Sequence, residues 1–138
     1  MADAWTREQI QETLMGSPCI AFLQPQVEVA DATKQELTVY IPFRPEFERR
    51  AGTAQWHGGP MAMIVDTVGD YALAMLLRRP LPTINFSIDY LRPAIGTGLR
   101  ATARVRRHGK SVGYVDVDVF DDKGSLVAIG RACYSTLE

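Results

Sequence analysis

The stretch Trp56-His57-Gly58-Gly59-Pro60 introduces a long helical pattern that decides how the rest of the chain is arranged. Two glycines stand before a proline, which favours the first position of a helix because it has no N–H to leave unpaired there. From Pro60 to about Leu77, apolar residues recur at helical spacing, and Pro80 and Pro82 prevent the helix from continuing. The sequence therefore predicts a long apolar helix that has bare backbone N–H groups at its positively polarised start.

Segments of alternating apolar and polar residues, which are typical of strands, lie on both sides of this helix. The predicted strands span residues 19–30, 36–43, 83–91, 98–107, 112–120 and 125–135, with turns over 93–98, 108–110 and 121–124. A short amphipathic helix is predicted over 6–15, with Thr6 as its N-cap, and an irregular charged loop over 44–56. A long apolar helix between strands must bury its surface against a curved antiparallel sheet, so we expect an α+β fold.

Rows of opposite charge mark two neighbouring predicted strands. Arg104 and Arg106 alternate with apolar residues on one strand, and Asp116 and Asp118 do so on the next. We expect the two rows to face each other across the ladder, as a solvated sheet face and not as a stripe that binds nucleic acid.

Length and composition bound the functional class. The 138 residues suit one domain, 1–138, and the formal net charge of −1 gives no global field that would attract nucleic acid or an anionic membrane. Cys19 and Cys133 are far apart and are expected to be reduced thiols that behave as small apolar residues. The first residues lack a secretory pattern and no uninterrupted apolar run reaches about 20 residues, so we expect a soluble, cytoplasmic protein.

Two carboxylates interrupt the apolar helix. Asp66 falls near its middle, where a carboxylate is unfavourable unless it has a partner or faces a cleft. Asp70 follows one turn later on the same side, and two carboxylates at this spacing raise each other's pKa. We take Asp66 as the group that does chemistry and Asp70 as a secondary candidate, which could instead pair with an arginine. The alternative is that this side of the helix is simply wet.

Four motifs, in order and at consistent intervals, carry a resemblance to a known family. They are His57-Gly58-Gly59, Asp66 nine residues after the histidine, Asp89-Tyr90-Leu91-Arg92-Pro93-Ala94, and the hairpin Arg104–Ser111 followed by Val115–Asp121 and Gly124. Together they resemble the hotdog-fold thioesterases, and more narrowly the PaaI-like branch of the phenylacetate pathway, which hydrolyses acyl-CoA.

The resemblance implies a specific architecture and mechanism. It implies a long central helix wrapped by a six-stranded antiparallel sheet, and a homodimer, often paired again into a homotetramer, with active sites at the subunit interface. The backbone N–H of Gly58 or Gly59 would polarise the thioester carbonyl. Asp66 of the other subunit would act as general base or as nucleophile. Coenzyme A is then part of the substrate, and no metal or redox cofactor is needed.

Further residues around the helix start are candidates for the site. His57 could donate to the carbonyl or support the loop, and Thr83 could orient the attacking water or simply begin a strand. Many relatives carry an amide side chain six residues before the histidine, where this chain has Ala51. Gln55 is the nearest amide, so either it substitutes or the amide is absent.

Two further groups of residues are candidates for binding the substrate. Basic and polar residues that suit the phosphates of coenzyme A, or that form an ordinary charged turn, are Arg92, Arg107, His108, Lys110 and Ser111. Apolar residues that could line an acyl tunnel, or belong to the core, are Trp56, Met61, Met63 and Tyr71.

The leading hypothesis is an acyl-CoA thioesterase that acts on a medium-chain or aromatic acyl group. The alternatives are a non-catalytic acyl-CoA-binding hotdog protein, suggested by Ala51, and a hotdog hydratase or dehydratase.

Overall fold

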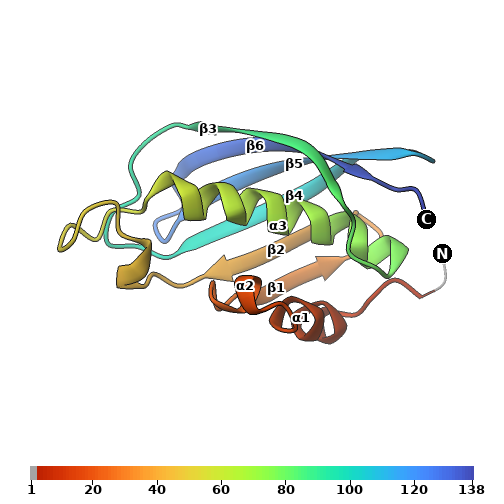
Figure 1. The fold of residues 1–138 in the computed structure, drawn as a ribbon, viewed down its shortest axis with the longest axis horizontal. Coiled ribbons are helices and arrows are strands. Elements are labelled where there is room, and N and C mark those ends of the chain that lie inside the picture. Colours follow the sequence, from red (N-terminus) through yellow and green to blue (C-terminus); the bar gives the residue numbers. More distant parts are fainter. Residues whose placement is uncertain (1–2) are drawn as a thin grey trace.

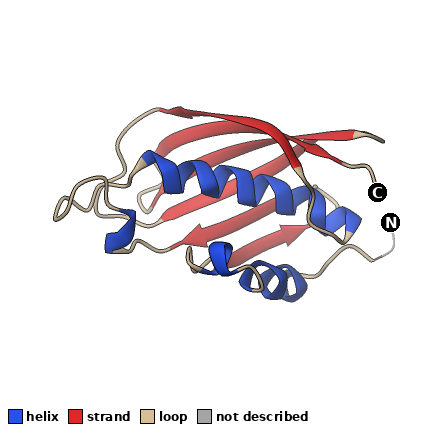
Figure 2. Ribbon diagram, viewed as in Figure 1, coloured by secondary structure: helices blue, strands red, loops and turns tan. Residues whose placement is uncertain are grey.

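One long helix lies across a six-stranded antiparallel sheet in the computed structural model, which describes residues 3–138 (Figure 1). The helices are α1 (Arg7–Met15), α2 (Pro18–Ala21), the 3-10 helix η1 (Pro45–Phe47) and α3 (Gly58–Leu77). The strands are β1 (Gln26–Asp31), β2 (Glu36–Ile41), β3 (Thr83–Tyr90), β4 (Leu99–His108), β5 (Val112–Asp121) and β6 (Leu126–Ser135). Their order in the sheet is β1-β2-β4-β5-β6-β3 (Figure 1). Figure 2 distinguishes the helices from the strands in the same view. The predicted α+β arrangement is confirmed.

The core forms where α3 packs on the middle of the sheet. Ile64 and Leu73 of α3 are fully buried, as are Ala101 of β4 and Val117 of β5. The helix has a mean hydropathy of 1.4, enough by length and composition to cross a membrane, but most of it is buried inside the protein. Its apolar surface is therefore accounted for as the core helix of the fold.

The helix begins two residues earlier than predicted. His57 is the N-cap, so Gly58 and Gly59 form its first two positions and Pro60 its third. Proline is tolerated there for the same reason as at the first position, since no N–H in the first turn has a partner within the helix.

The outer face of the sheet carries the predicted rows of opposite charge. Arg104 pairs with Asp116 in the register of β4 and β5, and Arg131 of β6 donates to the Asp116 carboxylate at 2.6 Å. Arg106 lies 3.4 Å from the same carboxylate. Such exposed pairs contribute about 0–1 kcal/mol each, so this face is solvated, as expected.

The N-terminal segment differs from the prediction between residues 19 and 25. The helix α1 is present and Thr6 caps it, but the expected strand over 19–30 is divided into the one-turn helix α2 and the shorter strand β1. Ser17 caps the Ile20 N–H at 3.3 Å and Pro18 occupies the first helical position, so local capping overrides the weak alternation. Cys19 on α2 and Cys133 are free thiols, and Cys19 is exposed.

The loop over residues 44–56 is more ordered than its charged composition suggests. It contains η1, and its two aromatic residues, Phe47 and Trp56, are buried and stack with ring centroids 4.8 Å apart. The indole N–H of Trp56 donates to the Thr97 carbonyl at 2.8 Å. These contacts fix the chain that leads into α3.

Strand β3 is an edge of the sheet, and this placement leaves its apolar side chains uncovered. It pairs with β6 alone, and Ile84 and Tyr90 are about half exposed, at 51% and 50%. Phe86 is 37% exposed. Natural sheets rarely leave an apolar edge open, because its free N–H and C=O groups invite pairing with another strand.

Gly69 of α3 provides a test of this packing. A Cβ at Gly69 would lie 2.5 Å from the hydroxyl oxygen of Tyr134, which is fully buried and donates to the Asp66 carbonyl at 2.6 Å. Alanine normally stabilises a helix by about 1 kcal/mol relative to glycine. We expect Gly69→Ala instead to lower the free energy of unfolding by about 1–2 kcal/mol, as overpacking does.

The measurement is urea denaturation. Tyr134→Phe removes the clashing oxygen, so Gly69→Ala should be better tolerated in that background. A stabilising Gly69→Ala in the natural background would contradict the packing described here.

Candidate active site

The start of α3 leaves one backbone N–H free. A helix has four N–H groups without intrahelical partners. Here the His57 N–H donates to the Phe47 carbonyl at 2.8 Å, the Gly59 N–H donates to Nδ1 of the His57 ring at 2.8 Å, and Pro60 has no N–H. Of the four positions at the start of α3, His57 to Pro60, only Gly58 has an N–H without an acceptor among the described residues. The predicted role of Gly59 as a bare donor is therefore wrong, and Gly58 alone fits it.

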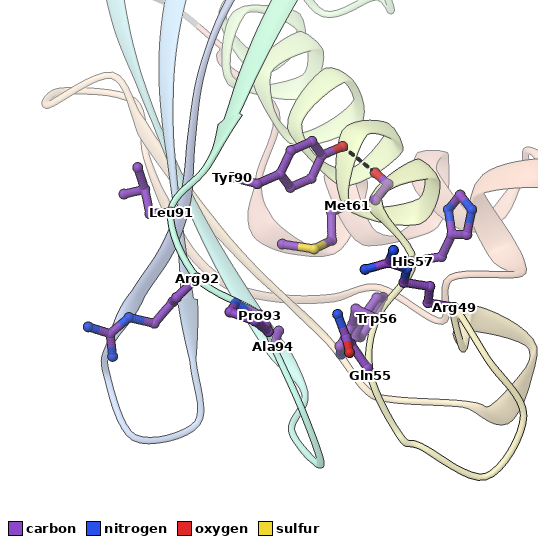
Figure 3. Close-up of a pocket in the computed structure, with 11 residues that line it drawn as sticks. Arg49, Gln55, Trp56, His57, Met61, Tyr90, Leu91, Arg92, Pro93 and Ala94 are labelled. Carbon is purple, nitrogen blue, oxygen red and sulfur yellow. Dashed lines mark hydrogen bonds between the residues drawn. The ribbon is translucent and has the colours of Figure 1, made fainter.

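Tyr90 fixes the position of Gly58. Its hydroxyl, at the end of β3, donates to the Gly58 carbonyl at 2.5 Å (Figure 3). A Cβ at Gly58 would lie 2.9 Å from the same hydroxyl oxygen, so a residue with a side chain would displace Tyr90. No local sequence pattern indicates this contact, because it joins residues from two different elements.

A cavity of about 500 Å³ opens beside the free N–H. It is lined by Arg49, Gln55, Trp56, His57, Gly58, Met61, Tyr90, Leu91, Arg92, Pro93 and Ala94 (Figure 3). Trp56 and Met61 are each only 3% exposed. Both residues therefore belong to the core and also line the pocket, so the two alternatives predicted for them, core and cavity lining, hold together.

The loop before the pocket settles which amide is available. Ala51 is exposed and does not line the cavity, whereas Gln55 does. The loop is closed by the Glu48 carboxylate, which accepts the N–H groups of Gly52 and Ala54 at 3.2 and 2.7 Å. Gln55 is thus an amide side chain that lines this pocket, and its substitution for the amide missing at Ala51 stays a prediction.

Two arginines flank the same cavity. Figure 3 shows Arg49 beside His57, and Arg92 on the opposite side of the view, below Leu91. Neither forms an ion pair with a carboxylate in the part of the chain that the structure describes. Arg92 was a predicted anion-binding residue. Arg49 was not predicted, since nothing in its loop distinguishes it from Arg50.

Asp66 lies two turns further along α3 and outside this cavity. Its Oδ1 accepts a hydrogen bond from the Thr83 hydroxyl at 2.8 Å, at the start of β3. Eight residues of helix separate it from Gly58, about 12 Å along the axis. The structure therefore brings the predicted pair Asp66 and Thr83 together, but within one chain it keeps them apart from Gly58.

Asp70, one turn after Asp66 on α3, is largely buried. Burial raises the pKa of Asp70 to about 7, the negative charge of Asp66 adds to this shift, and a hydrogen bond from the Leu81 N–H at 3.0 Å opposes it. The predicted pairing with an arginine is wrong, since the recorded partner is this backbone amide. As a secondary candidate for the site, Asp70 stays a prediction, and it does not line the Gly58 cavity.

The predicted basic hairpin lies at the other end of the sheet. Arg107 and His108 end β4 opposite Tyr114 and Gly113, and Gly113 in turn pairs with Tyr134, the register partner of Thr83. Arg107, His108, Lys110 and Ser111 are all exposed. In a single chain the hairpin therefore shares the end of β3 that carries Thr83, whereas Arg92 shares the end that carries Tyr90.

Comparison with known proteins places this geometry in a family. Residues 55–128 match the model of the thioesterase superfamily. A candidate esterase of Halobacterium salinarum is 34% identical over 78% of each chain, and the acyl-coenzyme A thioesterase PaaI of Escherichia coli is 33% identical over 58% of this chain and 57% of its own.

Solved structures agree with this assignment. A thioesterase-superfamily protein superposes with a TM-score of 0.88 at 34% identity, covering 94% of this chain and 96% of its own. The Escherichia coli PaaI structure superposes with a TM-score of 0.76 at 23% identity, covering 96% and 99%. The predicted resemblance is confirmed: the chain belongs to the thioesterase superfamily, as a PaaI-like thioester hydrolase of hotdog fold.

Proposed function

We propose that the protein hydrolyses acyl-CoA thioesters with a medium-chain or aromatic acyl group, at a site built from two copies of the chain. One observation carries this proposal. The free Gly58 N–H and the Asp66–Thr83 pair lie at opposite ends of a single exposed edge strand, β3.

If β3 paired with β3 of a second copy of the chain, the Thr83 end of one strand would lie beside the Tyr90 end of the other. Strands related by a twofold axis run antiparallel, and each residue then meets its counterpart on the other side of the axis. With the axis between Phe86 and Ser87, Thr83 of one chain lies opposite Tyr90 of the other. The Asp66 carboxylate then faces the partner's Gly58 end, and the open apolar edge is covered.

The chemistry follows from these groups. The Gly58 N–H donates to the carbonyl oxygen, and one such donor contributes about 2.7–4 kcal/mol to stabilising the oxyanion. As a general base, Asp66 takes a proton from water while the water oxygen bonds to the carbonyl carbon. The tetrahedral intermediate then collapses, the C–S bond breaks, and the proton on Asp66 passes to the leaving thiolate. Attack by the Asp66 carboxylate itself is the other route, and both use only the chain and water.

The thioester substrate class is supported by the pocket and by a relative. The cavity has apolar lining from Met61, Leu91 and Ala94, and Arg49 and Arg92 stand where the phosphates of coenzyme A could approach. The Escherichia coli relative is an acyl-CoA thioesterase. In the paired arrangement the partner's basic hairpin lies at this same end and would add further cations.

His57 and Gln55 have supporting roles in this scheme. Because Nδ1 of His57 accepts the Gly59 N–H, a neutral ring carries its proton on Nε2. The ring therefore holds the helix start and leaves Gly58 as donor. Gln55 lines the same cavity, and in this scheme its amide contacts the thioester or the attacking water.

Hydrolysis of an acyl-CoA panel tests the proposed function. We expect release of free thiol from medium-chain or aromatic acyl-CoA, and a loss of about 10²–10⁴-fold in kcat for Asp66→Asn, since that variant removes the base. The exposed Glu12 on α1 provides the control, Glu12→Gln. Tight binding without turnover would favour a non-catalytic acyl-CoA-binding protein. Hydration of an enoyl-CoA would favour a hydratase.

Mixing two inactive variants tests whether the site is shared. Asp66→Asn and Gly58→Val each disable both sites of a homodimer. If each site takes Gly58 from one chain and Asp66 from the other, a mixed dimer regains one intact site. Denaturing and refolding the variants together at a 1:1 ratio should then restore about a quarter of the natural activity. No recovery, with both variants folded and dimeric, would rule out the shared site.

Substitution of His57 separates capping from direct chemistry. His57→Ala should lower the free energy of unfolding by about 1 kcal/mol, because the Gly59 N–H loses its acceptor. His57→Asn keeps an N-cap acceptor and should retain both stability and most of the kcat. If the stable asparagine variant lost activity as severely as Asp66→Asn, His57 would act directly on the substrate.

A further inference from the structure

We propose that Asp70 is a positioning residue for the Asp66 carboxylate, acting through the chain segment that carries Thr83. This inference rests on the function proposed above. It concerns a carboxylate that the mechanism does not otherwise use.

Two hydrogen bonds connect the two carboxylates to the same short segment, residues 81–83. Asp70 Oδ1 accepts the Leu81 N–H at 3.0 Å, and Leu81 is 5% exposed. Two residues later, the Thr83 hydroxyl donates to Asp66 Oδ1 at 2.8 Å. Asp66 and Asp70 are one turn apart on α3, so the helix and the segment 81–83 are joined at both ends of a small ring.

Asp70 holds the segment 81–83 in place through its bond to the Leu81 N–H. The Pro82 carbonyl accepts the Ser135 N–H at 2.9 Å, so β6 holds the segment from one side and Asp70 holds it from the other. Without the carboxylate, the Leu81 N–H would be left unpaired near the core, which costs about 1–3 kcal/mol. Movement of the segment to solvate that N–H would carry the Thr83 hydroxyl away from Asp66.

The groups around Asp70 include a second carboxylate, so ionisation of Asp70 changes the charge near Asp66. On α3 its neighbours are Asp66 and Tyr71, and from β6 the Tyr134 hydroxyl approaches, with its pKa raised by burial and by both carboxylates. From β3 the neutral Thr83 hydroxyl bonds to Asp66, and within residues 3–138 neither carboxylate forms an ion pair. Arg79, on the connection between α3 and β3, donates instead to the Thr136 carbonyl at 2.9 Å. An ionised Asp70 therefore adds a second negative charge beside Asp66 with no cation bonded to it.

Ionisation of Asp70 gives a direction to the pH profile. Burial raises the pKa of this carboxyl to about 7, so Asp70 is protonated below neutral pH and charged above it. The charged form accepts the Leu81 N–H more strongly and so holds the segment that carries the Thr83 hydroxyl more firmly beside Asp66. We therefore expect kcat to rise as pH increases through about 7.

Three forms of the full chain separate these effects. The natural protein, Asp70→Asn and Asp70→Ala are compared in acyl-CoA hydrolysis from pH 5 to 9, with Glu12→Gln as the control. Asparagine keeps an acceptor for Leu81 and removes the charge, so kcat should lose the rise near pH 7 while KM stays within about twofold. Alanine removes the acceptor as well, and kcat should fall about 10- to 100-fold at every pH, as expected for a displaced catalytic group.

Amide hydrogen exchange supplies a readout that does not depend on turnover. Exchange at Leu81 should accelerate in Asp70→Ala and remain slow in Asp70→Asn. A folded Asp70→Ala with natural kcat, or with natural protection at Leu81, would overturn the role of Asp70 alone, as would an unchanged pH profile in Asp70→Asn. Failure of the natural protein to hydrolyse any acyl-CoA would instead overturn the proposed function, and this role with it.

Discussion

Burial of α3 is the constraint on which the rest of the structure depends. The helix is apolar on nearly every side, so it is stable only when the sheet covers it and the neighbouring segments close over its ends. Its only charged side chains are Asp66 and Asp70, one turn apart. Because the core covers the other faces of the helix, the two carboxylates lie on the flank next to β3. There the Thr83 hydroxyl donates to Asp66 and the Leu81 N–H donates to Asp70. The boundary of the core thus determines where the two carboxylates of α3 lie.

The edge strand β3 connects this core to the surface. One end of it carries Thr83, bonded to Asp66, and the other carries Tyr90, bonded to the Gly58 carbonyl. The same strand therefore positions both parts of the proposed site and leaves them about 12 Å apart along the helix in one chain. Its exposed apolar side chains are unfavourable in water, so the strand that separates the two parts of the proposed site in one chain is also the edge that we propose a second copy covers.

Local patterns in the sequence predicted the elements well, and contacts across space less well. The position of Asp66 in an apolar helix identified a candidate site, and alternation gave the strand bounds after residue 83 to within one residue. Nothing local could show that β3 is an edge, because that depends on the order of strands in the sheet. The Tyr90 bond to Gly58 and the burial of Asp70 were missed for the same reason. The segment 19–25 was misjudged because one capped turn has too few residues to display a period.

The free donor at Gly58 shows how closely the local sequence and the chemistry are linked. A helix start exposes four N–H groups, which water or a substrate could reach with little discrimination. In this chain the His57 N–H is used by Phe47, the Gly59 N–H by the His57 ring, and Pro60 removes another. The remaining N–H belongs to the residue that Tyr90 holds by its carbonyl. In the proposed site a substrate carbonyl at this helix end would therefore meet one donor in one fixed orientation, and such preorganisation, rather than the number of donors, is what lowers the free energy of an oxyanion.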